Sequence, residues 1–159
     1  VHQRTTLHEL QDSLLPHQVF IIMDWKMKIL PSIFREPMRE WFRKSGISMH
    51  GSAVIFKSEN GDLKIICYDD VCDDGKQDWF AVLSMIEVVL KRIKSQFPQI
   101  TEVLCLETDN AGCYVNQELI LGLRDMGTLT GISVLNLVHT EAGDGKTRLD
   151  GHFSFTMHG

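Results

Sequence analysis

Three acidic residues stand at the ends of apolar segments that lie far apart in the sequence. Asp24 interrupts one apolar run, Asp109 ends a second, and Asp150 follows a third by a dozen residues. An ionised carboxylate in or beside a buried strand costs several kcal/mol unless it is paired or binds a metal. The three acids therefore predict a divalent-cation site assembled by the fold, and such a site indicates phosphoryl transfer on nucleic acid.

The expected chemistry is that of two metal ions. Two ions roughly 3.5–4 Å apart can activate an attacking oxygen and stabilise a leaving one. Mg²⁺ and Mn²⁺ take oxygen ligands and keep several waters, so a few carboxylates from separate elements are enough. We expect Asp24 to bridge the ions, because a central strand holds it rigidly. The alternative is a buried aspartate that backbone amides or a lysine satisfy.

The other acidic positions leave alternatives open. Asp109 precedes a helical pattern, so capping that helix is the alternative to metal binding, and Asn110 could cap instead. For the third ligand we prefer Asp150, which falls in the last helical segment. Glu141, just past the last strand pattern, is the second choice. Asp144 lies in a glycine-flanked turn, where we expect it to be solvated.

Three basic side chains are candidates for contacts with substrate phosphates. His139 could shuttle a proton or contact a phosphate, although a histidine at a strand end is more often structural. Lys26 and Lys146 could steady phosphates as well. Solvated surface lysines are at least as good an interpretation of these two residues.

Three other site motifs fail on inspection. The segment 145–147 resembles the end of a phosphate-binding loop, but Thr140 stands where that motif requires glycine. Residues 70–75 resemble the start of an EF-hand loop, but Ala81 stands where the twelfth position requires glutamate. The cysteines and histidines have no zinc-binding spacing.

The composition is that of an ordinary globular domain. The chain has 159 residues, 43% of them apolar and 23% charged, which favours one domain over 1–159 with its core in 18–159. The formal net charge of -5 argues against strong binding of nucleic acid by this chain alone. We therefore expect DNA contacts mainly through segments outside this sequence.

The four cysteines are Cys67, Cys72, Cys105 and Cys113, and none forms a CxxC pair. Reduced thiols in an intracellular compartment are the simplest interpretation. No signal peptide and no apolar run of membrane-spanning length is visible, so no membrane partner is expected. Because the sequence begins with valine and stops soon after a helical pattern starts, we expect a piece of a longer protein.

Periodicity predicts an α/β order of elements. A hairpin is predicted where Asn60-Gly61 separates two strand patterns, and a parallel arrangement where strands and helices alternate. The result is a mixed sheet with helices on both faces. The predicted segments are a helix over 2–15, a strand over 19–29, an inserted helix over 30–46, strands over 48–58 and 63–68, a polar loop over 69–75, a helix over 79–97, a strand over 100–108, a helix over 115–126, a strand over 131–139 and a helix from about 146.

This order and three local strings resemble a known superfamily. The strings are Asp24-Trp25-Lys26-Met27-Lys28, Thr108-Asp109-Asn110-Ala111-Gly112-Cys113-Tyr114, and Glu141-Ala142-Gly143-Asp144-Gly145-Lys146 followed by Asp150. Together they resemble the ribonuclease H-like fold of ribonucleases H, retroviral integrases and DDE/DDD transposases, in particular transposase-derived proteins. The resemblance implies a mixed five-stranded sheet (βββαβαβα), with acids in the first strand, at the end of the fourth and in the last helix.

The same resemblance implies a function. A domain of this kind hydrolyses a DNA phosphodiester and joins the freed 3′-hydroxyl to target DNA, using Mg²⁺ or Mn²⁺. It further implies DNA as partner, a possible homo-oligomer in a transposition complex, and a nuclear location.

Two other functions remain open. A ribonuclease H or an exonuclease has the same fold, but Lys26 stands where exonucleases carry a second acid. Ribonucleases H carry a glutamate on the first long helix, where Glu87 is the only one. An inactive interaction domain, the remaining hypothesis, would bind no metal.

Overall fold

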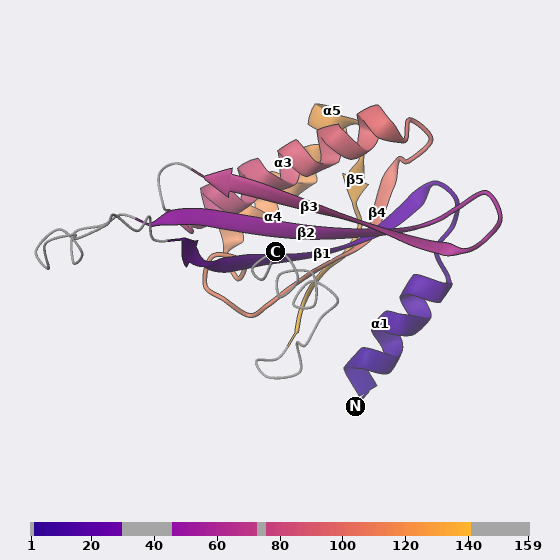
Figure 1. Ribbon diagram of the computed structural model, residues 1–159, viewed down its shortest axis with the longest axis horizontal. Helices are drawn as coiled ribbons and strands as arrows, with labels where there is room; N and C mark the ends of the chain where they lie inside the picture. Colours follow the sequence, from indigo (N-terminus) through magenta and orange to yellow (C-terminus); the bar gives the residue numbers. More distant parts are fainter. Residues whose placement is uncertain (1, 30–45, 73–75, 141–159) are drawn as a thin grey trace, which may run out of the picture.

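The computed structural model describes residues 2–29, 46–72 and 76–140 (Figure 1). The inserted helix expected over 30–46 and the last helix expected from about 146 lie outside these residues, apart from Gly46. The described elements are α1 (His2–Asp12), β1 (Gln18–Ile29), β2 (Ile47–Lys57), β3 (Leu63–Cys72), α3 (Trp79–Gln96), β4 (Glu102–Thr108), α4 (Gln117–Arg124), α5 (Met126–Thr130), β5 (Ser133–Val134) and β6 (Leu137–His139).

The strands form one mixed sheet in the order β3-β2-β1-β4-β5, and β6 also pairs with β4. Pairing is antiparallel between β1 and β2 and between β2 and β3, and parallel between β4 and each of β1, β5 and β6. The two short strands β5 and β6 occupy the place of the single strand expected over 131–139. Between them the backbone bonds to β4 continue, from the Leu135 amide to the Val103 carbonyl at 2.9 Å and from the Leu106 amide to the Asn136 carbonyl at 2.8 Å. The side chain of Asn136 also donates to the carbonyl of Leu104 at 2.7 Å.

The β2–β3 hairpin forms where Asn60-Gly61 predicts it. Gly61 has φ +84°, a left-handed conformation that a side chain disfavours, and its amide donates to the Ser58 carbonyl at 2.9 Å. Strand β3 continues to Cys72. The prediction that a polar loop begins at residue 69 was therefore wrong. The backbone of 69–72 pairs with β2, and an edge strand tolerates polar side chains such as Asp70, which is 2.9 Å from Arg92.

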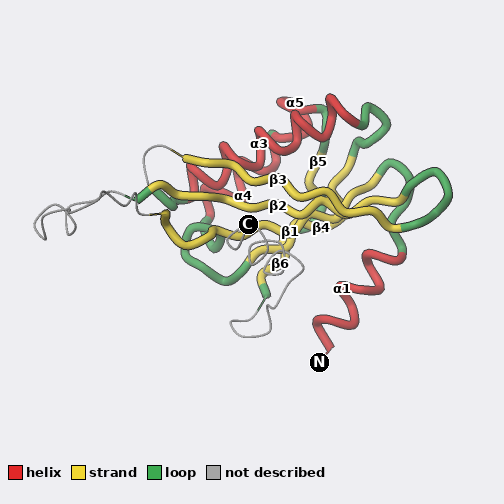
Figure 2. Tube along the Cα trace, in the orientation of Figure 1, coloured by secondary structure: helices red, strands yellow, loops and turns green. Residues whose placement is uncertain are grey.

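Helices cover both faces of the sheet, as expected (Figures 1 and 2). Helices α3, α4 and α5 pack on one face, where α3 contributes buried residues at helical spacing. Helix α1 covers the other face, to which it contributes Leu7. None of the described helices is long and apolar enough to cross a membrane. The buried residues of α3 are Val82, Ile86, Val89, Leu90 and Ile93.

The helix expected over 115–126 is in fact two helices. Asn116 caps α4 by accepting a hydrogen bond from the Glu118 amide at 2.8 Å. After α4, the amide of Asp125 bonds to the Gly122 carbonyl three residues back, and the chain turns into α5. Gly122 allows α4 to approach α3, because a Cβ there would lie 2.5 Å from a methyl of Leu83.

A buried polar group lies between the sheet and its covering helices. His50 of β2 is fully buried, and its Nε2 lies 3.1 Å from the hydroxyl of Tyr114. The ring of Trp25 on β1 contacts His50 edge-on, with centroids 4.7 Å apart. Burial lowers the pKa of His50 to about 3, so this imidazole is neutral at physiological pH.

The neutral state of His50 makes a testable prediction about acid stability. Between pH 6.5 and about 3 the unfolded chain binds a proton at His50 that the folded chain does not bind. The free energy of unfolding should therefore fall with decreasing pH in that window, by at most about 1.4 kcal/mol per pH unit from this residue. Imidazole NMR signals, with His50 assigned by its loss in His50→Gln, should show no titration of His50 above pH 5. A midpoint near 6.5 would contradict the prediction.

The hairpin turn gives a second prediction. Gly61→Ala should lower the free energy of unfolding by about 1 kcal/mol, because alanine is strained at positive φ. Gly112→Ala is the matched control, since no heavy atom lies within 4 Å of its added Cβ and its φ is not positive. Urea unfolding of both variants measures the difference in the free energy of unfolding. Equal values would contradict the prediction that the positive φ at residue 61 disfavours a side chain there.

Candidate functional site

Two of the predicted acids lie side by side where the parallel pairing of β1 with β4 ends. In the pairing of β1 with β4, Met23 is opposite Thr108, so Asp24 and Asp109 are the next residues on the two chains. Both line one pocket of about 40 Å³. The fold therefore brings together two acids that are separated by more than half the sequence. The pocket's other lining residues are Ile22, Met23, Glu107, Thr108 and Thr140.

The size and the donors of this pocket limit its possible occupants. A water molecule takes about 30 Å³ in the liquid, so the pocket holds a water or a single ion but no nucleotide. Carboxylate oxygens are the donors that Mg²⁺ and Mn²⁺ take. Among residues 2–29, 46–72 and 76–140, no three His, Cys, Asp or Glu side chains form a metal-holding group. The two aspartates thus fit the chemistry of such an ion, and further donors would have to complete the set.

Glu107 is a site residue that the sequence reasoning did not single out. Its side chain lines the same pocket, and the residue is only 6% exposed. Burial, and after it the negative charge of Glu107, raises the pKa of the Cys105 thiol to about 12. A charge inside the apolar run 103–108 was the available signal, and it is the same signal that identified Asp24.

Asp109 has a local role besides lining the pocket. It is exposed, and its Oδ1 accepts a hydrogen bond from the Ala111 amide at 3.0 Å. Helix α4 begins only at Gln117 and is capped by Asn116, so the alternative in which Asp109 or Asn110 caps this helix is wrong. The bond to Ala111 closes a short turn directly after β4 and uses one carboxylate oxygen.

Asp24 is half-buried on the central part of the sheet. Its antiparallel partner on β2 is Gly51, and the partner of Gly51 on β3 is Asp69. Directly opposed residues share a face, so Asp24 and Asp69 stand on either side of a residue without a side chain. Negative charge is therefore concentrated at this end of the sheet.

The negative charges of Asp24 and Asp109 affect the pKa of the buried Tyr114. Burial chiefly raises the pKa of the Tyr114 hydroxyl, and the charges of Asp24, Cys113 and Asp109 raise it further. The hydroxyl thus stays protonated and acts as a neutral hydrogen-bonding group next to the site.

The structure also bears on two of the basic candidates. Lys26 is only 8% exposed, so the interpretation of it as a solvated surface lysine was wrong. His139 lies beside Thr108 in the β4–β6 pairing, with its Nδ1 2.8 Å from the threonine hydroxyl. This contact gives His139 a structural role at the strand end. Glu141, Asp144, Lys146 and Asp150 all lie outside the described residues.

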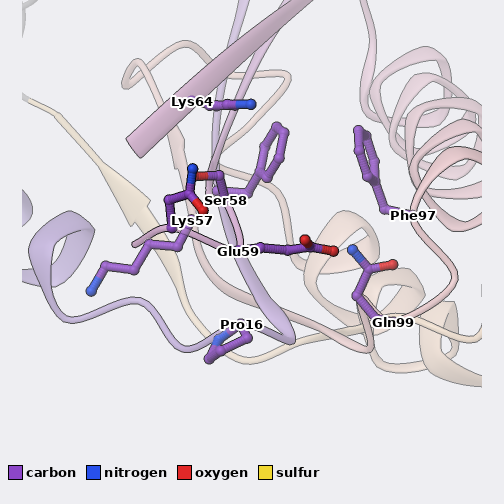
Figure 3. Close-up of a pocket in the computed structure, with 9 residues that line it drawn as sticks. Pro16, Lys57, Ser58, Glu59, Lys64, Phe97 and Gln99 are labelled. Carbon is purple, nitrogen blue, oxygen red and sulfur yellow. The ribbon is translucent and has the colours of Figure 1, made fainter. Parts of the chain in front are cut away.

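A larger pocket of about 680 Å³ lies at the other end of the sheet, by the β2–β3 turn (Figure 3). The rings of Phe56 and Phe97, 4.8 Å apart, form one wall. Lys57 points away from it, as Figure 3 shows, and its ammonium donates to the Asp12 carbonyl at 2.6 Å. None of the predicted site residues lines this pocket. Its lining residues are Pro16, Phe56, Lys57, Ser58, Glu59, Asn60, Lys64, Phe97 and Gln99.

Solved structures with a similar fold are transposase and integrase cores. The Mos1 mariner paired end complex with Mn aligns with a TM-score of 0.52 at 14% identity, over 98% of this chain and 45% of that chain. The catalytic domain of Mos1 mariner transposase aligns with a TM-score of 0.49 at 14% identity, over 99% and 68%. The catalytic core domain of BIV integrase aligns with a TM-score of 0.41 at 12% identity, over 91% and 65%.

The alignment to the Mos1 paired end complex shows the fold. The expected ribonuclease H-like α/β fold is confirmed by the strand order together with the alignment to the Mos1 complex. The chain spans less than half of the Mos1 protein in that complex and less than two thirds of the BIV integrase core.

Sequence comparison gives a family. No curated protein matches the chain in sequence. The family described as Domain of unknown function (DUF8701) matches residues 3–154, nearly the whole chain. The chain therefore belongs to the family Domain of unknown function (DUF8701).

Proposed function

We propose that this chain is a metal-dependent catalytic domain of the DDE/DDD transposase type, which cleaves a DNA phosphodiester and transfers the strand. The observation that carries the proposal is the meeting of Asp24 and Asp109 in one ion-sized pocket, where the pairing of β1 with β4 ends. The Mos1 structure that aligns along nearly the whole chain is a complex with Mn, which supports the choice of metal.

The proposed roles of the residues follow from their places in the fold. Asp24 is held by β1, which is paired on both sides by β2 and β4, so its position is rigid. Asp109 is held by the turn that its own Oδ1 closes with Ala111. Bound Mg²⁺ or Mn²⁺ would activate the attacking oxygen and stabilise the leaving one. The carboxylates bind and orient, and a rigid geometry reduces the entropy lost on reaching the transition state.

The third carboxylate of the proposed site is Asp150, with Glu141 as the alternative. Glu107 is a further candidate, because it lines the pocket that Asp24 and Asp109 share. Its low exposure means that an ion would have to approach it from the pocket side.

The interpretation as a ribonuclease H loses support. That activity would require Glu87 of α3 to face the metals, but its carboxylate pairs with Lys91 one turn along the same helix. An exonuclease would require an acid at position 26, where a buried lysine stands. DNA as partner, assembly with further copies in a transposition complex and a nuclear location belong to the proposal.

Metal binding is the first test. Asp24→Asn and Asp109→Asn should each weaken Mn²⁺ binding by more than about a hundredfold, because losing a ligand costs more than losing an outer contact. Asp62→Asn, in the exposed hairpin turn, is the matched control and should bind as the wild type does. Isothermal titration calorimetry measures the three affinities. A wild-type chain that binds no Mn²⁺ or Mg²⁺ would favour the inactive interaction domain instead.

The reaction is the second test. With Mn²⁺, the protein should join an oligonucleotide with a free 3′-hydroxyl to target DNA and should leave an RNA–DNA hybrid intact. Asp150→Asn should abolish joining if Asp150 is the third ligand, whereas Glu141→Gln should then retain it. Gel assays of labelled strands separate these results, and degradation of the hybrid without joining would assign ribonuclease H activity.

A further inference from the structure

Two segments that carry the proposed ligands converge on one buried histidine. Trp25, the residue after Asp24, contacts the ring of His50 edge-on at 4.7 Å. From the other side, the hydroxyl of Tyr114 lies 3.1 Å from Nε2 of His50. Both His50 and Tyr114 have no exposed surface.

Hydrogen bonds link Tyr114 back to Asp109. The amide of Tyr114 donates to the carbonyl of Ala111 at 2.9 Å, and the amide of Ala111 donates to Oδ1 of Asp109 at 3.0 Å. The segment after β4 is therefore a chain of short contacts that runs from the Asp109 carboxylate to His50. No strand or helix holds this segment before α4 begins at Gln117.

We propose that His50 and Tyr114 are positioning residues for the acidic site, and that their hydrogen bond holds the segment carrying Asp109 at a fixed place relative to Asp24. This inference rests on the proposed function, because it assigns a role towards a metal that Asp24 and Asp109 bind. His50 and Tyr114 touch neither metal nor substrate, and they act through the two aspartates.

The burial of the pair explains why it can serve this purpose. A hydrogen bond between buried groups is not exchanged with water, so breaking it leaves an unsatisfied polar atom. The neutral imidazole adds no positive charge that would compete with a cation for the carboxylates. Outer groups that orient metal ligands typically change affinity by about 10–100-fold when they are removed.

The test uses the two tyrosines of the chain as a matched pair. Tyr114→Phe deletes the hydroxyl that bonds to His50, whereas Tyr68→Phe deletes a hydroxyl that bonds to Gln96 of α3 at 2.6 Å. The chain of 159 residues is titrated with Mn²⁺, and free Mn²⁺ is followed by electron paramagnetic resonance. The melting temperature is measured without metal.

Tyr114→Phe should weaken Mn²⁺ binding by on the order of tenfold. Tyr68→Phe should stay within about twofold of the wild type, because its hydroxyl bonds to Gln96 and is not one of the contacts that link Asp109 to His50. Both variants should melt at lower temperature than the wild type, so the melting temperature reports lost hydrogen bonds and the affinity reports positioning.

A second pair of variants distinguishes the effect of the hydrogen bond to Tyr114 from the effect of the His50 ring itself. In His50→Gln the side-chain amide can take the place of Nε2, so the affinity should be largely retained, whereas His50→Leu should lose it as Tyr114→Phe does. Wild-type affinity in Tyr114→Phe and His50→Leu, with lowered melting temperatures, would overturn the inference and leave the proposed function intact. Absence of Mn²⁺ binding by the wild type would overturn both.

Discussion

Parallel pairing of β1 with β4 is the constraint on which the site depends, because it is what places Asp24 next to Asp109. These acids are 85 residues apart in the sequence and meet only when both strands run in the same direction. A parallel pair requires a crossover connection, which here includes β2, β3 and α3. Helix α3, which covers one face of the sheet, is thus also part of the connection that lets β1 and β4 run in the same direction.

The same arrangement has an electrostatic cost. Asp24, Asp69 and Glu107 stand at or near this end of the sheet, and Glu107 is buried. Like charges in a medium of low polarity repel, and a divalent cation would relieve that repulsion. On the face covered by α3, α4 and α5, the buried polar groups His50 and Tyr114 are neutral.

Buried polar groups gather on one face of β2, the strand that pairs with β1 beside Asp24. In the described part of the chain, Ser48, His50 and Ser52 follow one another along one face of β2 and are fully buried, and each has a buried polar atom without a hydrogen-bond partner. The hairpin, the helix α3 and the apolar strands obey the ordinary rules of pattern and turn chemistry. Local exceptions of this kind concentrate at functional sites in proteins.

The order of the described elements up to β4, the Asn60-Gly61 hairpin and the periodic core of α3 could be predicted from the sequence, because these follow from spacing along the chain. The sequence also singled out Asp24 and Asp109, which the fold brings to one pocket, since a carboxylate beside an apolar run stands out. Only the tertiary structure decided that Glu107 joins them, that Lys26 is buried, and that Trp25 and Tyr114 meet at His50. The break between α4 and α5 and the extension of β3 also depended on partners distant in sequence. Such contacts carry no local periodicity, because strand register and packing between elements bring them together.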